Sequence, residues 1–152
     1  VRQIIACREL LAAALAAGGW DHLLFLEDDL EFNRHLRHNL ESWWPLRSGL
    51  VRLASLYNPG VRLLVGGPGC AAADPDTVFG SQALLLSRPC AGYLLGHYDE
   101  EIGMQDIRFS RLAARLGPIY YHTPSLVQHV GRDSAWGGWF HQADDFDPEF
   151  CA

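Results

Sequence analysis

The sequence predicts a single α/β domain over residues 1–152, built on a mixed, largely parallel sheet that is flanked by helices. Three observations indicate this fold class. A helical pattern rich in Ala and Leu opens the chain, an unbroken apolar run follows it closely, and later apolar runs alternate with helical patterns. The length allows a sizeable core, and a composition of 49% hydrophobic and 20% charged residues is typical of globular proteins.

The first helix and strand form one α/β unit. Residues 2–17 are predicted to be helical, and the pair Gly18-Gly19 ends the helix. A strand follows over residues 22–27, and its unbroken apolar character is typical of a strand buried on both faces. Because the chain begins at Val1, directly in the helix, we expect an N-terminally incomplete domain.

A second helix and two strands follow. Residues 32–44 have apolar side chains on one helical face, and Pro45 is expected to end this helix. Residues 50–57 and 61–65 are predicted strands, separated by the turn Asn58-Pro59-Gly60.

The remaining elements alternate in the same way. Residues 66–79 are rich in Gly, Pro, Ala and Asp without periodicity, so we expect a loop. Residues 80–86 predict another buried strand and residues 90–98 a short helix. Asp106 opens a further helix, and a last strand is expected within residues 125–130.

The charge balance restricts the partners. A net charge of −6, without any Lys/Arg cluster, argues against a nucleic-acid surface. No apolar run approaches the roughly 20 residues of a transmembrane segment. The cysteines lack metal-ligand spacing, so we read them as reduced thiols of a cytoplasmic protein, with a disulfide pair in the lumen of the secretory pathway as the alternative. They are Cys7, Cys70, Cys90 and Cys151.

Three consecutive acids, Glu27, Asp28 and Asp29, follow the first strand. Ligands bind at the carboxyl edge of open α/β sheets, and adjacent carboxylates repel one another unless a cation or substrate is present. On an extended backbone Glu27 and Asp29 would point to one side and Asp28 to the other. This spacing predicts a site for Mg²⁺ or Mn²⁺ that also holds phosphate. The alternative is a solvated acidic loop.

Three further features are candidates for the same site. Gly80, followed by Ser81 and Gln82, would allow a ligand to approach the backbone at a strand start, or is an ordinary loop glycine. Asp106 is an N-cap or a carboxylate ready to accept a proton. His129, in an alternating strand, is a structural histidine or a further metal ligand.

Taken together, these motifs resemble those of the GT-A glycosyltransferases. FLEDDL resembles the DxD-type motif, and FGSQALLLS resembles the glycine loop that faces the donor sugar. MQDIRFSRLAARLG is similar to the acidic motif that opens the helix with the catalytic base, and PSLVQHVG to the strand with the C-terminal metal-binding histidine. The EDD form resembles inverting N-acetylglucosaminyltransferases, and also glycosyltransferases that use LEDD in lipooligosaccharide synthesis.

The resemblance implies a metal-dependent transfer of a hexosyl or N-acetylhexosaminyl group from a nucleotide-diphospho-sugar, such as a UDP-sugar. The acceptor would be a hydroxyl of a carbohydrate or another molecule, and the outcome inversion. Asp29 would bind Mn²⁺ or Mg²⁺ directly, with His129 as a further ligand. Glu27 and Asp28 would contact the ribose and sugar of the donor, or the metal through water.

The resemblance also assigns the sugar pocket and the base. Gly80, Ser81 and Gln82 would line the pocket, and Asp106 would deprotonate the acceptor hydroxyl. The chain departs from the family in two respects. Gln105 stands where a second acid often precedes the base, and the first strands of the family, which hold the nucleotide base, are missing from a resemblance that spans residues 2–131.

Residues 131–152 suggest a flap over the substrates. Trp136 and Trp139 would stack on sugars among flexible glycines, and Arg132 is a candidate ligand of the diphosphate. Alternatively, the two tryptophans cap the core. For the whole chain, two other functions stay open: a non-catalytic or truncated module that binds sugar-nucleotide and metal, and a Mg²⁺-dependent phosphohydrolase.

Overall fold

The protein is a mixed α/β domain. The computed structural model describes residues 2–61, 63–67, 69–74, 76, 78, 80–131 and 141–152, and only the backbone of 64–67. The helices are α1 (Arg2–Ala17), α2 (Leu36–Ser42), α3 (Trp44–Arg47), α4 (Arg88–His97) and α5 (Gln105–Ala114), with a 3₁₀ turn η2 (Tyr98–Glu100). The strands are β1 (His22–Leu26), β2 (Leu30–Phe32), β3 (Leu53–Ser55), β4 (Leu63–Gly67), β5 (Cys70–Ala73), β6 (Ala83–Ser87), β7 (Ile119–His122) and β8 (Val127–His129).

The main sheet is largely antiparallel, in contrast to the predicted largely parallel one. Within the described residues its strand order is β1-β6-β3-β7-β5-β4, and β3–β7 is its one parallel pair. β1 lies at an edge and its first four residues are half-buried, so the prediction of a strand buried on both faces is wrong. β2 and β8 form a separate antiparallel pair.

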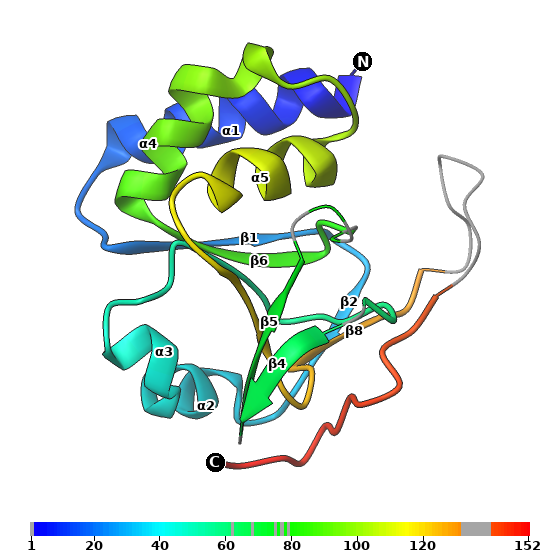
Figure 1. The fold of residues 1–152 in the computed structure, drawn as a ribbon. Helices are drawn as coiled ribbons and strands as arrows, with labels where there is room; N and C mark the ends of the chain where they lie inside the picture. Colours follow the sequence, from blue (N-terminus) through cyan, green and yellow to red (C-terminus); the bar gives the residue numbers. More distant parts are fainter. Residues whose placement is uncertain are drawn as a thin grey trace.

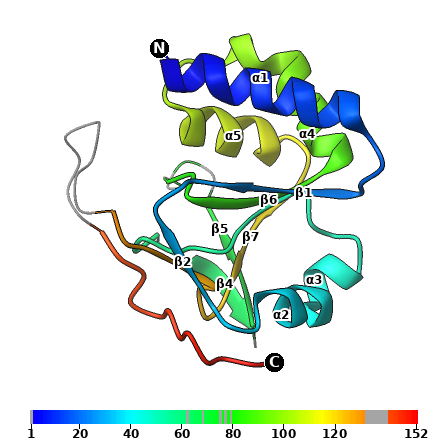
Figure 2. The ribbon, with the colours of Figure 1, turned by 180° about the vertical axis from the view of Figure 1, so that it is seen from behind.

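Two helical layers cover the sheet. Figure 1 shows α1, α4 and α5 together on one face, and α2 with α3 on the other; Figure 2 shows the same arrangement from behind. The larger core lies under the first layer, where Leu11, Leu94 and Phe109 are fully buried against strands β3, β6 and β7. This packing fixes the N-terminal end of α5 near the start of β6.

The segment after the acids differs from the helix predicted for residues 32–44. Residues 30–32 form β2 instead, and α2 begins only at Leu36. The Asn33 side chain accepts a hydrogen bond from the backbone of His35 (2.7 Å), which favours a turn before the helix. Pro45 opens α3 rather than ending a helix, because its fixed φ suits the first helical turn.

The stretch 66–79, predicted to be a loop, contains β5. Ala has little intrinsic strand propensity, and β5 (CAAA) forms because it pairs with β4 on one side and β7 on the other. The sequence analysis also left β7 unassigned. The helices over 2–17 and 90–98, the strand at 80–86 and the last strand within 125–130 are confirmed, with shifts of a few residues.

The C-terminal segment 141–152 runs back across the molecule, as the red trace in Figure 1 shows, and is held by polar contacts. The Asn33 amide donates to the carbonyls of Asp147 (2.8 Å) and Phe150 (3.0 Å), and Asn39 donates to Phe150 (3.0 Å). Both asparagines are buried. Among the described helices, none combines the length and apolar character needed to cross a membrane.

Candidate functional site

The three acids follow directly after β1, which ends at Leu26, and the Glu27 amide still donates to the Gln82 carbonyl of the neighbouring chain segment (2.9 Å). Glu27 is half-buried and accepts a hydrogen bond from the Ser81 hydroxyl (2.9 Å). Asp29 lies 3.0 Å from the His129 imidazole, and Asp28 is exposed. The two carboxylates predicted to share one side of a strand therefore contact different partners.

Glu27 belongs to a set of polar residues that we call the Ser81 network, consisting of Glu27, Gly80, Ser81, Gln105 and Asp106. The Gln105 amide donates to the Ser81 hydroxyl (2.5 Å), which in turn donates to Glu27. Ser81 and Gln105 are only 5% and 3% exposed. Gln105 thus fixes the direction of the Ser81 hydroxyl. This is the position at which the resemblance to GT-A glycosyltransferases led us to expect an acid.

Asp106 joins this network through the backbone. The N-cap of α5 is Met104, so the N-cap alternative for Asp106 is wrong. Asp106 Oδ2 accepts the amide hydrogen of Gly80 and Oδ1 that of Ile107, both at 2.8 Å. The first turn of α5 is therefore tied to the start of β6 through one carboxylate.

Gly80 allows a close approach to its backbone, and the group that lies there in the structure is the side chain of Gln82. The φ of Gly80 is +86°, and a Cβ at this position would lie 2.4 Å from Gln82 Oε1. That oxygen is buried without a hydrogen-bond partner among the described residues. Buried acceptors are normally paired, so Gln82 Oε1 is available to a hydroxyl or N–H of a ligand.

The electrostatics show that the predicted site residues converge. Burial raises the pKa of Glu27, the Ser81 hydrogen bond lowers it, and the charges of Asp29 and Asp106 raise it further. The electrostatic interaction with His129 lowers the same pKa. Three groups that are distant in sequence from Glu27, those of Ser81, Asp106 and His129, therefore lie within electrostatic range of the end of β1.

The other half of the site is the His129 cluster, which we define as Asp29, His129, His141 and Tyr57. The antiparallel pairing of β2 with β8 places Leu30 opposite His129 and so brings Asp29 beside the imidazole. Asp29 Oδ2 and His129 Nε2 are 3.0 Å apart, so either a proton or a cation lies between them. A Cβ at Gly131 would collide with Asp29 Oδ2, so a side chain at this position would displace the Asp29 carboxylate from its contact with His129.

The sequence analysis missed two members of this cluster. The His141 ring stacks on the His129 ring, with centroids 4.8 Å apart and planes at 20°. The Tyr57 hydroxyl lies 2.7 Å from His141 Nδ1. The short spacing from His129 to His141 was a usable signal, whereas nothing in the sequence distinguishes Tyr57 from other buried tyrosines.

Asp29 and His129 fit a divalent cation as two of its ligands. Two neighbouring ligand atoms of an octahedral ion with bonds near 2.1 Å are about 3 Å apart, which is their separation here. Asp29 Oδ1 is also buried without a partner among the described residues. The imidazole favours Mn²⁺ over Mg²⁺, which prefers oxygen. No group of three or more His, Cys, Asp or Glu side chains in the described part could hold a metal ion.

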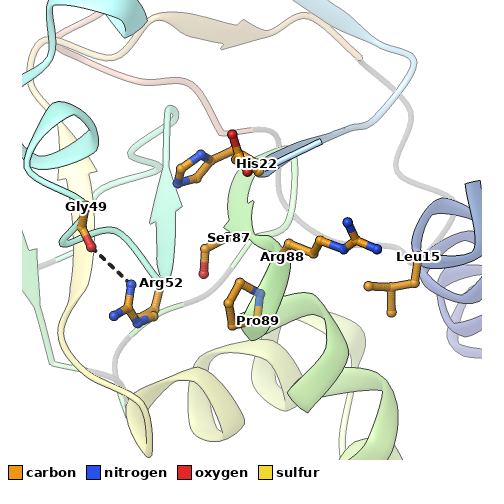
Figure 3. Close-up of a pocket in the computed structure, with 8 residues that line it drawn as sticks. Leu15, His22, Gly49, Arg52, Ser87, Arg88 and Pro89 are labelled. Atoms are coloured by element: carbon orange, nitrogen blue, oxygen red, sulfur yellow. Dashed lines mark hydrogen bonds between the residues drawn. The ribbon is translucent and has the colours of Figure 1, made fainter. Parts of the chain in front are cut away.

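Some predicted features lie elsewhere. Arg132, Trp136 and Trp139 are outside the described residues, so the predicted flap is described only from residue 141 onward. A cavity of about 600 Å³ lies at the opposite end of β1, near His22 (Figure 3). Its arginines, Arg52 and Arg88, point in different directions in Figure 3, and the cavity has no part in the site.

The fold and site define a mixed α/β domain with carboxylate, imidazole and amide groups gathered at one end of an edge strand. No protein family matches the sequence. No curated protein matches it either. The function is therefore argued from the geometry of the site.

Proposed function

We propose that the protein is a metal-dependent glycosyltransferase of the GT-A class, which transfers a sugar from a nucleotide-diphosphate donor to an acceptor hydroxyl with inversion. The observation that carries the proposal is the convergence of Asp29, Asp106 and His129 around Glu27. Asp29 and His129 are 100 residues apart in the chain and in direct contact.

Asp29 and His129 would hold Mn²⁺. The bound cation would supply Lewis-acid stabilisation of the departing nucleoside diphosphate. Asp29 Oδ1 supports this role, because it is an acceptor removed from water that has no hydrogen-bond partner among the described residues. In a protein with a net charge of −6, a cation is also needed for the diphosphate to approach the site.

The Ser81 network and the neighbouring Gln82 would bind the donor sugar. Gln82 Oε1 would accept a hydrogen bond from a sugar hydroxyl or from the N–H of an acetamido group. Ser81, fixed by Gln105, holds the Glu27 carboxyl beside this position. Asp28 is exposed just after the end of β1 and would contact the ribose of the donor.

Asp106 would accept the proton of the attacking hydroxyl. Two backbone N–H groups hold its carboxylate in one orientation, and each oxygen keeps a second lone pair for the acceptor. A fixed base on one side of the sugar and a cation at the leaving group suit in-line displacement, which inverts the anomeric carbon.

The test is a panel of nucleotide-sugars in thermal unfolding, with and without Mn²⁺, because a ligand of the native state raises Tm. We expect at least one donor to raise Tm only when Mn²⁺ is present, and Asp29→Asn to remove the shift. Asp21→Asn, an exposed acid before β1, is the matched control and should keep it. A panel without any Mn²⁺-dependent shift would contradict the proposal.

A second candidate is a module that binds metal and sugar-nucleotide without catalysis. The observation that favours it is the engagement of both Asp106 oxygens by backbone N–H groups, because donors stabilise the carboxylate and weaken it as a base. Donor binding without hydrolysis or transfer to any acceptor would support this candidate.

A further inference from the structure

We propose that Tyr57 and His141 are positioning residues for His129, and that they direct His129 Nε2 toward Asp29. This inference rests on the proposed cation site and assigns the residues that prepare it. Neither residue would contact the cation, so both would act through His129.

The contacts of His129 motivate the proposal. His129 Nε2 faces Asp29, and Nδ1 on the opposite side of the ring lies 3.3 Å from the His141 carbonyl oxygen. A carbonyl only accepts hydrogen bonds, so Nδ1 carries a proton. A cation that replaced the proton between Nε2 and Asp29 would leave the Nδ1 proton in place, and Nε2 would then present its lone pair to the cation, as is usual for metal-binding histidines.

Tyr57 fixes the carbonyl that sets this arrangement. Its hydroxyl lies 3.1 Å from the His141 carbonyl oxygen and 2.7 Å from His141 Nδ1. Both contacts are satisfied when the hydroxyl donates to the carbonyl and His141 Nδ1–H donates to the hydroxyl. The carbonyl then accepts from both Tyr57 and His129, using its two lone pairs.

Tyr57 is itself rigidly held. It is only 1% exposed, and the Ser55 hydroxyl at the end of β3 donates to its carbonyl (2.6 Å) and accepts from its amide (3.2 Å). The segment that carries His141 is also held. The Gln128 side chain accepts a hydrogen bond from the Ala143 amide (2.8 Å) and donates one to the Ala143 carbonyl (3.0 Å). These bonds hold the C-terminal segment beside β8.

The stacked geometry argues against His141 as a second imidazole ligand of the same ion. Ligand rings converge on a metal, whereas the planes of His129 and His141 are nearly parallel with centroids 4.8 Å apart. His141 Nδ1 is also engaged by Tyr57. The stack therefore supports the plane of the His129 ring.

The experiment compares Tyr57→Phe with Tyr98→Phe in the full chain. Tyr98 is equally buried, at 1% exposure, and lies in the helical layer. We expect Tyr57→Phe to weaken Mn²⁺ binding, measured by calorimetry, by about 10- to 100-fold, the loss typical of residues that orient a metal ligand. Tyr98→Phe should bind Mn²⁺ as the wild type does. A Tyr57→Phe protein with wild-type affinity would overturn the inference.

A second measurement does not depend on the cation. The ¹⁵N chemical shifts of the His129 ring report which nitrogen carries the proton, and they should change in cation-free Tyr57→Phe but not in Tyr98→Phe. If the wild type fails to bind Mn²⁺ while these shifts respond to Tyr57→Phe, the proposed function fails and the positioning role stands. Unchanged shifts in Tyr57→Phe would overturn the positioning role alone.

His141→Phe provides an independent variant, because it keeps the stacked ring and the backbone carbonyl and loses only the imidazole nitrogens. Positioning predicts a Mn²⁺ affinity between those of the wild type and Tyr57→Phe. A large loss in His141→Phe together with wild-type affinity in Tyr57→Phe would overturn the inference and make His141 a ligand.

Discussion

The two halves of the site are held in place by different parts of the fold. The Ser81 network connects β1, the start of β6 and the first turn of α5, all of which rest on the main core. The His129 cluster connects the small β2–β8 sheet, the segment after β3 and the C-terminal segment. The first depends on the helical layer, and the second on a segment that returns from the end of the chain.

The difference teaches how each half can respond to a ligand. In the Ser81 network the donors are backbone N–H groups and neutral side chains, with Glu27 and Asp106 as acceptors, so its geometry is fixed before a ligand arrives. In the His129 cluster a carboxylate faces an imidazole at 3.0 Å, and a cation can replace the proton between them. We therefore expect the first half to set stability and specificity, and the second to set cation affinity.

The largest expected effect is on transfer by Asp106→Asn. The amide oxygen can still accept from Gly80, so the Ser81 network should persist, but the amide cannot take a proton. We expect transfer to fall by about 10²- to 10⁴-fold, the usual contribution of a general base, with donor binding retained. Transfer rates and donor titrations would measure both. Wild-type turnover in the variant would exclude Asp106 as the base.

Next in size is the loss of cation affinity in Asp29→Asn. This change removes a charged ligand, so Mn²⁺ affinity should fall by more than the about 10- to 100-fold typical of lost supporting residues. Gln105→Leu, a change in the other half, should leave Mn²⁺ affinity unchanged. Calorimetric titration of both variants would sharpen the comparison, and equal losses would mean that the halves are coupled.

The sequence predicted which segments lie near the candidate site better than it predicted how the strands pair. The acids after β1, the Gly80–Gln82 stretch and His129 are all in the region where the motifs placed them, because each follows or precedes a strand with a strong apolar signal. The sequence placed Glu27 and Asp29 on one side of an extended segment, and the structure adds what the pattern did not contain, namely their different partners, Ser81 for Glu27 and His129 for Asp29. Tyr57 could not be found, because its contact with His141 spans 84 residues and carries no periodic pattern.

The same limit applies to the fold. β5 and β7 are stabilised by cross-strand pairing rather than by the strand propensity of their residues. β1 pairs with β6 alone in the main sheet and is therefore an edge strand. Local pattern identifies apolar segments, but neighbours and direction in a sheet are set by contacts distant in sequence.

Two glycines allow a matched test of stability. Gly80→Ala forces a side chain onto a φ of +86° and against Gln82 Oε1, whereas Gly49→Ala meets a φ of +67° with no atom within 4 Å. Both should destabilise the protein by about 1 kcal/mol or more through backbone strain, and Gly80→Ala by the larger amount. Urea unfolding would measure the difference. Equal losses would show that the Ser81 network accommodates a Cβ easily.

The smallest expected effect is an opposite pH dependence of the two halves, because Glu27 and His141 are only half-buried. The pKa of Glu27 is raised above 4.5, mainly by burial, so its contribution to the free energy of unfolding is present below pH 4.5 and lost as the pH rises. The pKa of His141 is lowered below 6.5 by burial and by His129, so its contribution is present above pH 6.5 and lost as the pH falls.

Glu27→Gln should therefore gain stability relative to the wild type as the pH rises from 4.5 toward neutrality, and His141→Gln should gain it as the pH falls below 6.5. Urea midpoints across this range would measure both slopes. If the two variants shifted in the same direction, the contrast between an acid-favoured and a base-favoured half of the site would be wrong.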